Sequence, residues 1–216
     1  MSRAIIGSVC MLIVNGMAGY ALSRPNLPWG KVFRLYFLFT MYFSGGIIPT
    51  YLLYKNLHLL NNYLVYILPV IVVPFNMFLI KTYIEAIPRD LEEAVLVDGG
   101  TEINAYFQVL LPLCMPVNAA VFLFSCINHW NAYIDNQLYN AMSNNLHTLQ
   151  YVLFNTLATQ TNKSLEEAKM MGIQNMVSSQ SLKMAITVIT IVPVMCVYPF
   201  LRKYFVSGLL VGSIKA

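Results

Sequence analysis

The sequence predicts an all-α membrane protein, a polytopic bundle of about five transmembrane helices in a single domain covering residues 1–216. First, 58% of the residues are hydrophobic and only 10% are charged, whereas a soluble domain carries about 25% charged residues. Second, five apolar stretches are long enough to cross a bilayer core about 30 Å thick as helices. Third, these stretches contain prolines, which membrane bundles tolerate because neighbouring helices satisfy the freed carbonyl groups. This composition argues strongly against a soluble enzyme and against a disordered chain.

The five predicted spans, whose ends are approximate, cover residues 4–22, 32–54, 63–80, 109–130 and 184–204. None of them contains Asp or Glu, and their few basic residues lie near span ends, where long side chains can reach the headgroups. The first span could be a cleaved signal peptide, but it is long, has only a weak cleavage site and is followed at once by basic residues. These features favour a retained helix.

The distribution of Lys and Arg predicts the orientation of the spans. Basic residues concentrate in the segments after the first, third and fifth spans. By the positive-inside rule, the N-terminus lies outside, the loop 82–108 and the C-terminus are cytoplasmic, and the loop 131–183 is extracytoplasmic. An odd number of spans with an outside N-terminus is explained if one helix upstream of Met1 is missing; a genuine five-span protein is the alternative.

The loop 82–108 is predicted to form two short helices. Six of the nine acidic residues lie between Glu85 and Glu102, where they can complement the dipole of a helix that starts at Pro88. Gly99 and its neighbouring glycine end the first helix, and Thr101 caps the second. Because residues 95–97 are more apolar than a connector needs, we expect a docking element held at the membrane face; a solvated connector is the alternative.

Residues 93–99 and 109–112 read EAVLVDG and VLLP and are separated by nine residues. This pattern resembles the EAA signature of ABC importer permeases, with valine in place of the second alanine and of the isoleucine. Residues 18–24 (AGYALSR) and 43–51 (FSGGIIPTY) resemble carbohydrate permeases, the latter their complex-sugar and oligosaccharide subgroup. The resemblance covers essentially the whole chain, except that the first helix of the family is absent.

The resemblance implies the type I ABC importer fold and transport of a carbohydrate, in particular an oligosaccharide, across the cytoplasmic (inner) membrane. It implies three kinds of partner: a second permease subunit, ATP-binding cassette ATPase subunits and an extracytoplasmic solute-binding protein. The residues that would couple to the ATPase are Glu93, Ala94, Asp98, Gly99 and Pro112.

The energy source must lie outside this chain. The sequence has no Walker A pattern, and its spans hold no carboxylate for a proton relay, so we expect ATP to be bound by partner subunits and no cofactor or metal here. No enzyme motif occurs, the four cysteines lack metal spacing, and the scattered basic residues do not predict nucleic-acid binding. A permease for a non-sugar solute is the main alternative, and a secondary carrier or channel is a weaker one.

A polar stripe runs along the fourth predicted span. Asn118, Phe122, Ser125 and His129 follow the spacing of one helical face. Polar groups with an aromatic ring suit a carbohydrate path, but polar side chains in membranes commonly bond neighbouring helices instead, and the sequence leaves both interpretations open. The long loop 131–183 is the expected contact for a solute-binding protein.

Overall fold

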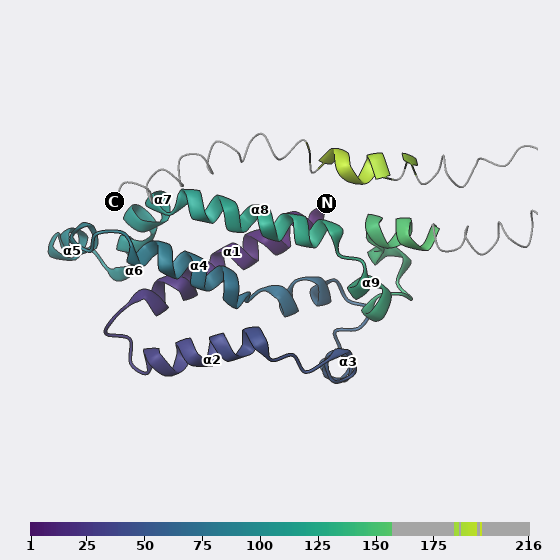
Figure 1. Ribbon diagram of the computed structural model, residues 1–216, viewed down its shortest axis with the longest axis horizontal. Helices are drawn as coiled ribbons and strands as arrows, with labels where there is room; N and C mark the ends of the chain where they lie inside the picture. The colour runs from purple at the N-terminus through teal and green to yellow at the C-terminus, as the bar shows by residue number, and fades with distance from the viewer. Residues whose placement is uncertain (157–183, 186, 194, 196–216) are drawn as a thin grey trace, which may run out of the picture.

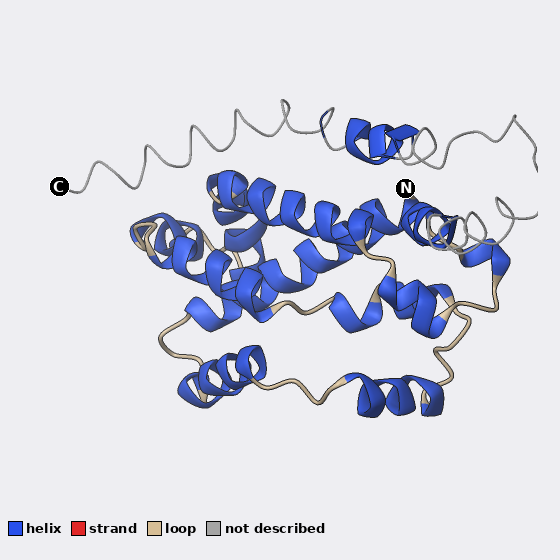
Figure 2. Ribbon diagram, turned by 45° about the vertical axis from the view of Figure 1, so that its right-hand side comes forward, coloured by secondary structure: helices blue, strands red, loops and turns tan. Residues whose placement is uncertain are grey.

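The computed structural model describes residues 1–156, 184–185, 187–193 and 195. Every regular element within these residues is a helix (Figure 2), which confirms the prediction of an all-α protein. The elements in chain order are α1 (Ser2–Ser23), α2 (Gly30–Tyr42), α3 (Ile47–Asn56), η1 (Tyr63–Tyr66), η2 (Leu68–Val70), α4 (Pro74–Glu85), α5 (Asp90–Val97), α6 (Glu102–Asn104), η3 (Ala105–Leu110), α7 (Leu111–Leu113), α8 (Met115–Asn131), α9 (Ile134–Tyr139) and η4 (Asn144–Leu146).

The core forms where α1 packs against both α4 and α8 (Figure 1). Met11, Ile80, Leu110 and Val121 are almost completely buried in one cluster at this contact. The buried face of α1 also carries several small residues, which let membrane helices approach closely and gain packing contacts. In contrast, Gly30 is the only buried residue of α2, and α3 has none.

One helix among the described residues, α1, is long and apolar enough to cross a membrane unaided. Counting each of three sharply bent helix pairs as a single span raises the number to as many as four. These pairs overlap the second, third and fourth stretches that we expected to be spans. The fifth, residues 184–204, lies largely outside the described residues; those described in it are helical.

The second predicted span, residues 32–54, is two helices rather than one. α2 and α3 meet at 115° across a short break. Gly46 directly precedes α3 and has a φ of +86°, a conformation outside the helical region that residues with a side chain adopt only at a cost. The apolar run alone did not reveal this bend.

The third and fourth predicted spans also bend. η1 and η2 join α4 at 46°, and the pair of segments 102–113 and 115–131 bends by 80°. Pro74 and Pro116 lie in the first turns of α4 and α8, and proline has no N–H to continue the preceding helix. α4 extends to Glu85, a few residues into the predicted loop 82–108.

Asn15 of α1 forms side-chain hydrogen bonds to the backbone at the break before α4. Its side chain is completely buried, and its Nδ2 donates to the carbonyl oxygens of Met11 and Ile71, at 2.7 and 2.8 Å. Its Oδ1 accepts from the backbone N–H of Val73 at 2.9 Å. The side chain thus satisfies backbone groups that the break leaves unpaired, as buried irregular backbone in membrane proteins requires.

Replacing Asn15 by Leu should therefore destabilise the bundle. The change leaves the Ile71 carbonyl and the Val73 N–H without this partner, and each buried unpaired group costs about 1–3 kcal/mol. We expect a clear fall in the unfolding midpoint of the purified protein in mild detergent. Met17→Leu, on the exposed side of the same helix, is the matched control. Equal midpoints for the parent and Asn15→Leu would contradict the assignment.

Candidate functional site

The predicted docking loop forms a separate short helix, α5, at one end of the bundle (Figure 1). The helix ends before Gly99, whose φ is +84°, and the N–H of Gly100 donates to the Val95 carbonyl at 2.8 Å. Thr101 Oγ1 accepts from the N–H of Asn104 at 3.3 Å and caps the next helix. The expected end and cap are confirmed, whereas the expected start at Pro88 is wrong because α5 begins at Asp90.

The candidate coupling residues lie on the surface of this loop. Glu93, Ala94, Asp98 and Gly99 are all exposed. Val97 is 85% exposed at the end of the helix, and Pro112 is exposed in α7. Exposed apolar side chains flanked by carboxylates are compatible with the apolar centre and polar rim of a protein interface.

Glu92 differs from its neighbours because it is buried, with 6% of its surface exposed. Its carboxylate accepts from the Arg24 guanidinium at the end of α1. Burial lowers the pKa of Arg24, but the hydrogen bond to Tyr20 and the charge of Glu92 outweigh this effect, and the pKa rises. No local sequence pattern predicts this ion pair, because its two residues lie 68 positions apart. The one sequence signal is an arginine directly after the first predicted span.

α8 carries the polar stripe, and its four residues differ in burial and in whether they line a cavity. Asn118, Ser125 and His129 are buried, and Phe122 is half-buried. Asn118 Oδ1 has no hydrogen-bond partner among the described residues. The His129 ring packs against Gly7 of α1, where an added Cβ would lie 2.6 Å from Nε2.

Ser125 and His129 line a hollow of about 450 Å³ between the start of α4 and the end of α8. The stripe residues Asn118 and Phe122 are not part of its lining. The polar lining residues are Arg3, Asn76, Ser125, Asn128, His129 and Asp135. Apolar and aromatic side chains, including Phe75 and Phe124, complete the lining, the usual composition of a small-molecule site.

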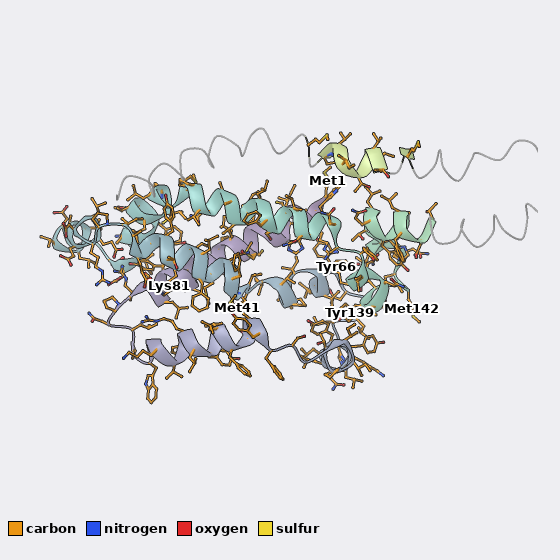
Figure 3. The ribbon with its side chains drawn as sticks, viewed as in Figure 1. Met1, Met41, Tyr66, Lys81, Tyr139 and Met142 are labelled. Carbon is orange, nitrogen blue, oxygen red and sulfur yellow. The ribbon has the colours of Figure 1, made fainter. Side chains whose placement is uncertain are left out.

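Beside the hollow, hydrogen bonds gather around Tyr66, which Figure 3 labels near the α9 end. Tyr66 Oη donates to the Leu146 carbonyl at 3.0 Å and accepts from Asn136 Nδ2. Arg3 lies over the Tyr66 ring, 4.4 Å from its centroid, and pairs with Asp135. Within the described residues, no three His, Cys, Asp or Glu side chains gather as metal ligands.

A bent helical bundle with an exposed short helix at one end and a polar-lined hollow toward the other fits a membrane transport subunit better than a single-pass anchor. Residues 15–211 match the family described as "Binding-protein-dependent transport system inner membrane component". The chain belongs to this family, a group of membrane components of ABC transporters.

Curated proteins and solved structures are similar to this chain over nearly its whole length. "Polygalacturonan/rhamnogalacturonan transport system permease protein YtcP" of Bacillus subtilis is 34% identical over 98% of this chain and 73% of its own length. "Arabinooligosaccharides transport system permease protein AraQ" of Halalkalibacterium halodurans is 30% identical over 98% and 71%. A chain of a bacterial ABC transporter "involved in the import of the acidic polysaccharide alginate" is 30% identical, with a TM-score of 0.81 over 94% of this chain and 73% of that chain.

Proposed function

We propose that this chain is a transmembrane subunit of an ATP-driven oligosaccharide importer and that it forms part of the translocation path. The observation that carries the proposal is the loop 90–99, which has the expected spacing and folds as an exposed helix apart from the bundle core. The saccharides named in the titles of YtcP and AraQ support the substrate class. The chain itself binds no ATP and catalyses no reaction; separate ATPase subunits supply the energy.

In this proposal α5 lies in the cytoplasm and docks on an ATPase subunit. Glu93, Ala94, Asp98 and Gly99 form or shape the contact, and Pro112 lies where the following segment turns into α8. The C-terminus is then also cytoplasmic. The α9 end faces outward, and the segment after α8 contacts a solute-binding protein, while a second permease completes the path.

A direct experiment is purification in mild detergent followed by transport in proteoliposomes. The proposal requires a second permease and ATPase subunits to co-purify, and it requires uptake driven by ATP in the presence of a binding protein. A stable homodimer without any ATPase, or uptake driven by an ion gradient alone, would refute it.

Within the polar stripe, we propose that Ser125 and His129 contact the sugar, because they line the hollow. Ser125→Ala should raise the KM for uptake about fivefold, since one hydrogen bond contributes about 1 kcal/mol. Ser8→Ala is the matched control, because Ser8 is a buried serine of the facing α1 outside the hollow. Equal KM values for Ser125→Ala and the parent would contradict the contact.

A further inference from the structure

The Arg24 guanidinium joins three elements of the bundle. Nη1 donates to Glu92 of α5, and Nη2 forms an ion pair with Glu102 of α6 at 2.8 Å. Nη2 also donates to the hydroxyl of Tyr20, and the guanidinium lies 4.3 Å from the centroid of that ring. One side chain at the end of α1 therefore holds both the docking helix and the helix that follows it.

The contacts are selective for arginine. A planar guanidinium offers several N–H donors in a fixed fork, so it can serve two carboxylates and a hydroxyl at once. Glu92 is buried, and within the described part of the chain Arg24 is its only ion-pair partner. Removing the guanidinium would leave a buried carboxylate without its countercharge, which is strongly unfavourable.

The cluster continues into the core. The Tyr20 hydroxyl donates to Glu102 Oε2 at 2.7 Å, and the Tyr20 ring lies 5.0 Å from the ring of Tyr106 in η3. α1 packs along α4 and α8, so these contacts connect α5 to the helices that line the hollow. α5 also packs against α6 and η3, and the Arg24 contacts add a side-chain link from α5 to α1.

We propose that Arg24 is a positioning residue that transmits the displacement of α5 to α1 during transport. The inference rests on the proposed function, in which ATPase subunits move α5. The Arg24 clamp, meaning Arg24 with Glu92, Glu102 and Tyr20, links α5 directly to α1, so that the two helices move together. Coupling energy then reaches the hollow through α1 as well as along the chain through α4 and α8.

The test compares Arg24→Gln with the parent in the assembled transporter. We expect ATPase subunits to co-purify and basal ATP hydrolysis to persist, while uptake and stimulation of hydrolysis by the binding protein each fall at least about tenfold. Glu92→Gln should give the same loss, and the double variant no greater one, because the two residues act as a unit. Arg24→Lys keeps the charge without the fork and should give intermediate uptake.

Lys81→Gln is the matched control. It breaks the ion pair of Lys81 with Glu85 inside α4, and Figure 3 labels Lys81 in the half of the bundle toward α5. This pair joins residues of one helix, so its loss should leave coupling unchanged. Uptake by Arg24→Gln equal to that of the parent would overturn the proposal. Loss of ATPase co-purification in Arg24→Gln would also overturn it, since Arg24 would then maintain the docking surface instead.

A second measurement does not depend on transport. In the chain in micelles, amide hydrogen exchange of residues 90–97 should quicken about tenfold in Arg24→Gln and not in Lys81→Gln, because α5 loses its side-chain attachment to α1. Unchanged exchange would overturn the clamp. If the parent recovers no ATPase subunits, the proposed function fails, while this measurement still decides whether Arg24 holds α5.

Discussion

Gly99→Val should strongly reduce uptake while leaving the protein in the membrane. The φ of Gly99 is +84°, and a Cβ there would meet no atom within 4 Å. The penalty is therefore backbone strain, about 1–2 kcal/mol and worst for β-branched residues. The backbone would relieve this strain by changing the direction of the end of α5, which would weaken its fit to the ATPase. We therefore expect uptake and ATPase co-purification to fall about five- to thirtyfold.

Gly45→Val is the matched control for this strain. A Cβ at Gly45 also meets nothing within 4 Å, but its φ is not positive, so the same substitution should be tolerated there. Gly99→Asn should retain more uptake than Gly99→Val, because asparagine enters the left-handed region more readily. The measurements are sugar uptake and ATPase recovery, both normalised to expression.

Glu93→Lys tests the same surface by charge. Glu93 is exposed, so reversing its charge should leave folding unchanged and weaken ATPase binding through a changed contact. ATPase co-purification and uptake should both fall, whereas the amount of protein in the membrane should not. If this variant and Gly99→Val both assemble and transport like the parent, the loop 82–108 is only a connector.

Local signals explain which parts of the fold could be predicted. The length and hydropathy of residues 4–22 predict a helix without any tertiary information, and the structure has α1 over Ser2–Ser23. The bend after residue 42 depends on the conformation at Gly46, which an apolar run does not report. The break before Pro74 is stabilised by Asn15, a partner 56 to 58 residues away in sequence.

In the docking loop, likewise, some features depend on neighbouring residues and others on residues far away in the sequence. Gly99 and Thr101 act on neighbouring backbone groups, so their roles as helix end and cap follow from the sequence. In contrast, the burial of Glu92 beside an exposed Glu93 depends on Arg24, 68 residues earlier. Helical spacing correctly placed Ser125 on one face of α8, but only the path of α4 decides which part of that face borders the hollow.

The ion pair between buried Arg3 and half-buried Asp135 should be a main determinant of stability at the end of the bundle opposite α5. Arg3 of α1 is 7% exposed; it forms the ion pair with Asp135 of α9 and also donates to the Ala132 carbonyl at 3.2 Å. Asp135→Leu removes the countercharge and leaves the guanidinium buried. Breaking such a pair from one side costs about 3–5 kcal/mol, and we expect a lower unfolding midpoint in detergent.

The double variant Arg3→Met, Asp135→Leu distinguishes this cause from loss of packing. Replacing both charges by apolar side chains removes the uncompensated charge, and such replacements are often neutral or stabilising. We therefore expect the double variant to unfold at a higher denaturant concentration than Asp135→Leu alone. Asp98→Leu, at an exposed aspartate, controls for the substitution itself and should unfold like the parent. A double variant as unstable as Asp135→Leu would show that the shape of the aspartate, rather than its charge, holds the N-terminal end of α1 against α9.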